Sequence, residues 1–239
     1  MEQIPKSATK RSELQMARSM CWHCQSAMTG EYFCEQCVKV QPLSKELDYF
    51  TCLGLPRLLQ IDPETVESRY YELSRLFHPD FFQQKTSTEQ AISLGNAALL
   101  NSAYRTLKDP IRRAEYLVQL EAGSVKDIRT SPPADLFEEI LELQEDLEEY
   151  KAQAPDDRSP AGEALRKKLA QDRESLEQRQ RDMESELFGL FGRWDALQAR
   201  TEGDDVRAEK QQVLKQMREI LSNRTYLRNI LNDLIATTS

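Results

Sequence analysis

The sequence predicts an all-α protein in which a small four-cysteine knot is followed by a helical hairpin and then by a three-helix bundle. Three observations predict this class. The chain is 39% hydrophobic and has only eight glycines and ten prolines among 239 residues, as is typical of a mostly helical protein. Apolar residues recur at helical spacing over residues 43–120, and seven-residue repeats follow further along the chain.

Charge and hydropathy narrow the classes of function. Charged residues make up 30% of the chain, the net charge is −8, and the basic residues are scattered, so we expect protein partners and no nucleic acid. No apolar run approaches the roughly 20 residues that cross a bilayer, and residues 1–19 form a flexible lead without the apolar core of a secretory signal. We therefore expect no membrane association and a cytoplasmic location, with the mitochondrial matrix as the alternative.

Residues 20–42 contain two Cys-x-x-Cys pairs, Cys21 with Cys24 and Cys34 with Cys37, separated by nine residues. Each pair can supply two thiolates, and four thiolates complete the tetrahedral shell of a closed, structural zinc site. Iron in the same site, two disulfides, or His23 replacing one thiolate are the alternatives. Cys52 lies outside this spacing, and we expect it to be a small core residue.

Three breaks divide residues 43–122 into four helices: Leu55-Pro56, His78-Pro79 and Asp109-Pro110. Asp62 can cap free amides and Pro63 suits a first helical position, so a helix should span 63–77. The next helices should span about 88–107 and 110–120. The expected core positions of the 88–107 helix are Ile92, Leu99, Leu100, Ala103 and Leu107.

A Gly/Ser/Pro-containing linker, residues 123–133, precedes a bundle at 134–239 with helices at about 134–152, 160–200 and 205–236. Apolar residues recur in the second and third of these helices at the spacing of helices packed side by side. They are Leu169, Leu176, Met183, Leu190 and Leu197, followed by Val213, Met217, Ile220, Leu227, Leu231 and Leu234. We expect Phe188, Phe191 and Trp194 to pack in the core, an additional contact surface being the alternative.

The first bundle helix has a wide apolar stripe. Its core positions are Leu136, Ile140, Leu143 and Leu147. Phe137 and Leu141 lie about 100 degrees around the helix from that stripe, beside Glu142 and Glu145. They form either a broader core or an exposed docking edge.

His78-Pro79-Asp80 ends the 63–77 helix in an unusual way. Proline disfavours helical geometry in the residue before it, so His78 should be extended and the helix should end there. The turn should then hold the imidazole and the Asp80 carboxylate outward. Glycine would end a helix more cheaply, which favours a role in recognition for this tripeptide.

The surroundings of this tripeptide resemble a J domain of the DnaJ type over residues 43–122. More narrowly, "DYFTCLGLP" (48–56), "RYYELSRLFHPDFF" (69–82), "LNSAYRTLKDPIRRAEYLVQL" (100–120) and "LELQEDLEEY" (141–150) are similar to the HscB family of co-chaperones for iron-sulfur cluster assembly. The N-terminal four-cysteine zinc module is similar to that of some members. Phe81 stands where the family commonly has Lys, and Glu138 where it often has an apolar residue.

The resemblance implies a co-chaperone without catalytic residues of its own. His78, Pro79 and Asp80, aided by Arg69 and Arg75, would bind the ATPase domain of an HscA/DnaK-type chaperone and stimulate its hydrolysis of ATP. A second surface would bind an IscU-type iron-sulfur scaffold and deliver it for cluster transfer. The scaffold-binding residues implied are Phe137, Leu141, Glu142, Glu145 and Leu227. A general J-domain co-chaperone for unfolded clients is the alternative, since it would share the ATPase contact but not the scaffold surface.

Two other classes fit the residues poorly. An enzyme would need a catalytic constellation, but the chain has only two histidines and no Gly-rich phosphate loop or nucleophile elbow. A zinc-dependent nucleic-acid module would need a basic surface, and the helix at 135–149 contains no Lys or Arg.

Overall fold

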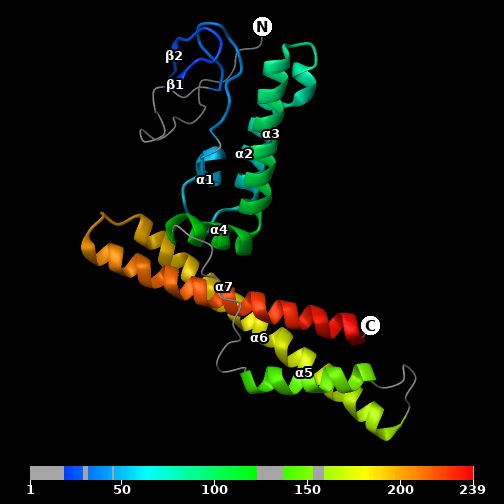
Figure 1. Cartoon of the computed structure of the whole chain (residues 1–239). Coiled ribbons are helices and arrows are strands. Elements are labelled where there is room, and N and C mark those ends of the chain that lie inside the picture. The colour runs from blue at the N-terminus through cyan, green and yellow to red at the C-terminus, as the bar shows by residue number, and fades with distance from the viewer. Residues whose placement is uncertain (1–18, 29–31, 45, 123–136, 153–158, 239) are drawn as a thin grey trace. The chain divides into compact units, whose positions relative to one another are not determined.

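The computed structural model describes residues 19–28, 32–44, 46–122, 137–152 and 159–238, and the chain divides into two compact units, residues 1–117 and 118–239 (Figure 1). The described elements are β1 (Ser19–Met20), β2 (Ala27–Met28), α1 (Tyr49–Cys52), α2 (Pro63–Phe77), the 3-10 helix η2 (Pro79–Phe82), α3 (Ser87–Lys108), α4 (Pro110–Ala122), α5 (Phe137–Ala152), α6 (Pro160–Gln198) and α7 (Asp204–Thr238). The predicted all-α class is confirmed. Most of the predicted lead, the whole predicted linker and Leu136 lie outside the described residues.

The four-cysteine segment contains two similar turns, one within residues 19–28 and one within residues 32–43. β1 and β2 pair antiparallel with Ser19 opposite Met28. In the first turn the Cys21 amide donates to the Ser26 carbonyl at 2.9 Å, and in the second the Cys34 amide donates to the Lys39 carbonyl at 2.9 Å. The residue after each Cys-x-x-Cys pair has a positive φ, as Gln25 and Val38 show. The two pairs therefore adopt the same local conformation.

α2 and α3 lie side by side as a hairpin (Figure 1). The Asp62 side chain accepts from the amides of Glu64 and Thr65 at the start of α2, as predicted. α2 ends at Phe77 because His78 is extended, with φ −61 and ψ 124. Leu73 and Phe77 of α2, like Leu100, Ala103 and Leu107 of α3, are buried.

The buried stripe of α3 differs from the prediction in its first half. Glu89, Ser93 and Asn96 are buried there, whereas Ile92 and Leu99 are only half-buried. The expectation for Ile92 and Leu99 was therefore wrong. The reason is that this half of the helix contacts the backbone of the neighbouring segments through hydrogen bonds, so polar side chains occupy the inner face.

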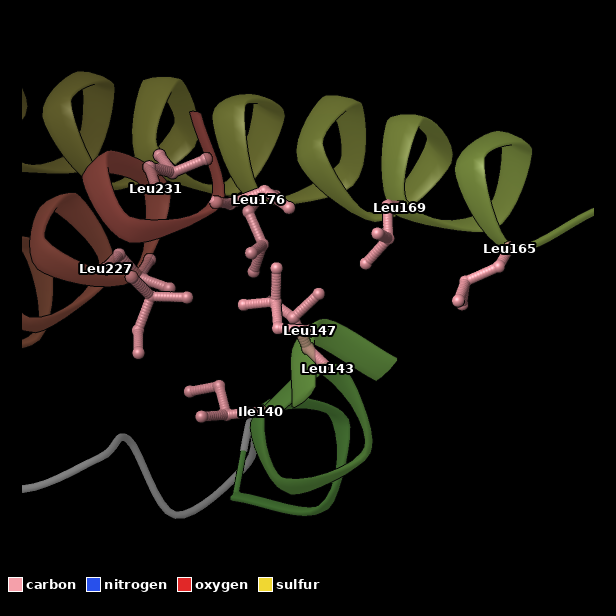
Figure 2. Close-up of a cluster of buried hydrophobic side chains, with 10 residues drawn as sticks. Ile140, Leu143, Leu147, Leu165, Leu169, Leu176, Leu227 and Leu231 are labelled. Atoms are coloured by element: carbon pink, nitrogen blue, oxygen red, sulfur yellow. The ribbon is translucent and has the colours of Figure 1, made fainter. Parts of the chain in front are cut away.

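In the second unit, α5, α6 and α7 share one apolar core. Figure 2 shows Ile140, Leu143 and Leu147 of α5 pointing toward leucines of α6 and α7. The buried members are Ile140, Leu143, Leu147, Leu165, Leu169, Leu176, Leu227, Ile230, Leu231 and Leu234. Phe191 and Trp194 are buried as predicted, but Phe188 is 41% exposed, which corrects the expectation that it packs in the core. None of the described helices combines the length and apolar character that a membrane span needs.

Candidate functional site

The His-Pro-Asp loop lies between α2 and α3 with its polar groups in solvent. The side chains of His78 and Asp80 are 50% and 70% exposed. His78 Nδ1 lies 3.4 Å from the Asp80 amide nitrogen and 3.5 Å from Asp80 Oδ2, so a neutral ring accepts from the amide and a protonated ring can donate to the carboxylate. The Phe81 amide donates to the His78 carbonyl at 3.0 Å. The loop thus presents an imidazole and a carboxylate outward on a short, hydrogen-bonded turn.

The stem of this loop is anchored from the inside. Phe77, the residue before His78, is fully buried, and its carbonyl accepts from the buried hydroxyl of Ser93 at 2.8 Å. On the far side of the loop, Gln90 Nε2 donates to the carbonyls of Gln83 and Lys85 at 2.9 and 3.1 Å. Both ends of the loop are therefore held by side chains of α3.

Sequence reasoning missed Ser93 and Gln90. A signal for Ser93 was available, because Glu89, Ser93, Asn96 and Leu100 follow one another at helical spacing and so share one face of α3. A polar residue on such a face is expected to bind something specific.

The two arginines expected to assist the loop differ in their surroundings. Arg69 donates to Glu72 at 2.9 Å one turn further along α2 and is half-buried. Arg75 is exposed in the last turn of α2, directly before the loop. Arg75 is the better placed of the two for contact with a partner.

The four cysteines come together as the spacing predicted. The sulfur atoms of Cys21, Cys24, Cys34 and Cys37 all lie within 4.8 Å of one another, and the pairs Cys21 to Cys37 and Cys24 to Cys34 are each 3.6 Å apart. A tetrahedral ion with metal–sulfur bonds of about 2.3 Å places its ligands about 3.8 Å apart, so the set fits a four-thiolate metal ion.

Two of the alternatives for the knot, the disulfides and His23, do not match this geometry, whereas iron would fit the same four sulfurs as zinc. A disulfide needs sulfurs at about 2.05 Å, and no disulfide joins the five cysteines, all of which lie in described parts of the chain. His23 is exposed and is not part of the group that could hold an ion. Cys52 is buried away from the group, as expected of a core residue.

The thiols of Cys34 and Cys37 have pKa values shifted in opposite directions before any metal binds. A hydrogen bond with the Ser26 hydroxyl, helped by backbone amides, lowers the pKa of Cys34 to about 6. Burial raises the pKa of Cys37 to about 12. Thiolates are the metal ligands, so Cys34 is ready to bind near neutral pH, whereas Cys37 must lose its proton to the solvent as an ion enters.

The apolar edge of α5 is exposed. Phe137 and Leu141 are 55% and 48% exposed, while Ile140 and Leu143 on the inner face are buried. Glu142 and Glu145 beside them are also exposed. Of the two alternatives for this stripe, the structure supports the exposed edge.

Leu227 does not belong to that surface. Its side chain is 0% exposed and lies in the core that α5, α6 and α7 share (Figure 2). A side chain enclosed in this way has no atoms to offer a partner. The expectation that Leu227 contacts a scaffold directly is therefore corrected.

Comparison with known proteins agrees with this geometry. Residues 48–116 match the DnaJ domain family, so the chain carries a J domain and is a J-domain protein. The chain is 36% identical to the mouse iron-sulfur cluster co-chaperone protein HscB over 140 residues, which are 56% of this chain and 59% of that one. It is 33% identical to the human protein of the same name over 156 residues, 63% of this chain and 66% of that one. It is 38% identical to co-chaperone protein HscB of Proteus mirabilis over 104 residues, 43% of this chain and 60% of that one.

Solved structures share the fold. The crystal structure of human co-chaperone protein HscB superposes with a TM-score of 0.63 at 24% identity, covering 91% of this chain and 98% of that one. Chaperone HscB from Vibrio cholerae gives a TM-score of 0.54 at 23% identity, covering 79% and 96%. Among J-domain proteins, this chain belongs to the HscB type. The matched regions span about three fifths to two thirds of the lengths of the mouse and human relatives.

Proposed function

We propose that this chain is a co-chaperone that stimulates the ATPase of an HscA/DnaK-type chaperone and delivers an IscU-type scaffold to it for iron-sulfur cluster transfer. The observation that carries the proposal is the outward display of His78 and Asp80 on a loop whose stem is anchored by Ser93. Relatives named iron-sulfur cluster co-chaperone support the cluster-assembly part.

The chain acts on the ATPase without being an enzyme itself. The exposed Asp80 carboxylate can accept a charge-assisted hydrogen bond from a guanidinium of the partner, which is stronger than a neutral one. Arg75, in the last turn of α2, adds a positive charge shortly before the loop begins. Because the loop is already ordered, little conformational entropy is lost when these groups bind.

The scaffold would bind at the exposed edge of α5. Phe137 and Leu141 supply apolar contact area, and Glu142 and Glu145 can pair with basic residues of the scaffold. This division leaves the J domain and the α5 edge to separate partners.

The four-cysteine module would hold zinc in a structural role. Cys21, Cys24, Cys34 and Cys37 would occupy all four positions of a tetrahedral ion and leave none for a reacting water. Bound zinc would cross-link the two turns of residues 19–43.

The test is ATP hydrolysis by a purified DnaK-type chaperone, measured with the full chain and with His78→Gln. Wild type should stimulate hydrolysis and His78→Gln should not, while both should retain an IscU-type scaffold in a pull-down. Phe188→Ala, an exposed ring in α6 outside the J domain, serves as a control and should stimulate like wild type. Full stimulation by His78→Gln would remove the proposed mechanism.

A further inference from the structure

Two aromatic residues of the four-cysteine module contact the stem of the His-Pro-Asp loop. We propose that Tyr32 and Phe33 are positioning residues for this loop, so that the order of the loop depends on the metal site. The functional meaning rests on the proposed function, since it assumes that the loop binds an ATPase. The physical link rests on contacts within the first unit alone.

The contacts converge on Phe77, the residue directly before His78. The ring of Tyr32 meets the Phe77 ring edge-on, with centroids 5.3 Å apart and planes at 87°. The ring of Phe33 is stacked on it from 6.4 Å, with planes at 11°. Aromatic pairs at these distances stabilise the packing beyond the simple burial of their surface. Two groups therefore fix Phe77: the rings of the four-cysteine module contact its ring, and the Ser93 hydroxyl donates to its carbonyl.

The module is also fixed to the helix that carries Ser93. Lys39 Nζ donates to the Glu89 carboxylate at 2.9 Å. Asn96 Nδ2 donates to the Gln41 carbonyl at 2.9 Å, and the Leu43 amide donates to Asn96 Oδ1 at 2.8 Å. These bonds join residues more than 45 positions apart in the sequence, so they position the module on α3 independently of the rings.

The cysteines connect this packing to the metal. Phe33 directly precedes Cys34, so a thiolate bonded to an ion fixes the backbone that carries the ring. Gln41 follows the Cys34–Cys37 pair in the sequence. Its Nε2 donates to Cys21 Sγ at 3.4 Å, and its carbonyl accepts from Asn96. Two sulfurs of the metal site, those of Cys34 and Cys21, are therefore connected to the segments that contact the hairpin.

The first test replaces both rings, Tyr32→Ala with Phe33→Ala, in the full metal-loaded chain. The readout is amide hydrogen exchange over residues 77–85, which include the Phe81 and Lys85 amides that donate to His78 and Phe82. We expect about tenfold faster exchange there, with unchanged exchange over α6 and α7 and an unchanged metal content. Unchanged exchange over 77–85 in the metal-loaded variant would overturn the proposal.

A matched variant separates the effect of ring packing from that of the tyrosine hydroxyl. Tyr32→Phe with Phe33→Tyr keeps both rings and should exchange like wild type. If the double alanine variant loses its metal, Tyr32→Leu with Phe33 intact removes one ring and keeps the apolar volume. This milder variant should show a smaller increase over 77–85, and exchange equal to wild type would count against the positioning role.

The metal arm uses the wild-type chain with its ion removed by a chelator. Exchange over residues 77–85 should rise toward that of the double alanine variant, and equal exchange with and without metal would overturn the link to the metal site. In ATPase assays the double alanine variant should need more protein for half-maximal stimulation, by the same factor by which the fraction of molecules holding the ordered loop falls, with a similar maximum. If wild type stimulates no ATPase, the proposed function fails, whereas the exchange data still decide whether the rings order the loop.

Discussion

The ammonium of Lys39 donates to the carboxylate of Glu89 at 2.9 Å, and the same carboxylate accepts from the hydroxyl and amide of Thr86 at the start of α3. Glu89 is buried. Burial opposes its charge, but the hydrogen bonds from Lys39 and Thr86 outweigh that penalty and hold the pKa of Glu89 below its ordinary value of 4.5. One carboxylate thus joins the four-cysteine module to the capping box of the hairpin.

Glu89→Gln should destabilise the first unit by about 2 kcal/mol, because it removes charge-assisted hydrogen bonds from a buried position. Denaturant unfolding at neutral pH measures this. The folded pKa lies below the unfolded one, so the stabilisation is present above about pH 4.5 and is lost as the pH falls through the folded pKa. The difference between wild type and variant should therefore shrink in acid. Glu72→Gln, an exposed partner of Arg69, is the control and should change stability by less than about 0.5 kcal/mol.

Val38→Gly should stabilise the four-cysteine module. Val38 has φ 57 and is 72% exposed, so a β-branched residue occupies the left-handed region without apolar packing in return. Glycine adopts this conformation without the clash, and we expect a gain of about 1 kcal/mol in the unfolding of the metal-loaded chain. Gln25→Gly, at φ 59 in the equivalent turn, should gain less because glutamine is not β-branched. A less stable Val38→Gly variant would contradict this account.

Phe137→Ala combined with Leu141→Ala should weaken scaffold binding without unfolding the bundle. Both side chains are about half exposed, so their removal leaves little cavity in the core. Truncating two apolar anchors at the centre of a contact should lower affinity at least about tenfold. A pull-down with an IscU-type scaffold measures this, with Phe188→Ala as the exposed aromatic control. Equal binding by wild type and the double variant would leave the general J-domain co-chaperone as the better interpretation.

Leu227→Ala should behave in the opposite way. The side chain is fully buried among α5, α6 and α7, so its truncation should cost about 2–5 kcal/mol of unfolding free energy. Scaffold binding should fall only where the bundle is already partly unfolded. A variant that binds poorly while keeping wild-type stability would show that Leu227 is a direct contact after all.

Much of this architecture follows from local chemistry in the sequence. The start of α2 at Asp62-Pro63, its end at His78 and the spacing of the four cysteines depend on residues close in the chain, and these predictions agree with the structure. For Leu227, the resemblance predicted a contact with the scaffold, whereas the repeating spacing of apolar residues in its helix predicted a core position, and the core position is the correct one. The hydrogen bonds of Asn96 could not be predicted in this way, because its partners lie more than 50 residues away in the sequence and the spacing of residues along a helix does not identify them.

The metal site should be occupied by one zinc ion per chain and should lose it in acid. Protons compete with the metal for every thiolate, so affinity should fall steadily from about pH 8 to about pH 6. Below about 6 even the Cys34 thiolate, whose pKa is lowered by the Ser26 hydroxyl, becomes protonated, and loss of the ion should be steepest there. Competition with a chromophoric chelator measures the affinity, and elemental analysis measures the stoichiometry. Cys34→Ser should abolish tight binding, whereas Cys52→Ser, buried outside the group, should keep the ion. Iron in place of zinc in the purified chain would correct the identity of the metal, and an affinity that does not change with pH would contradict binding through four thiolates.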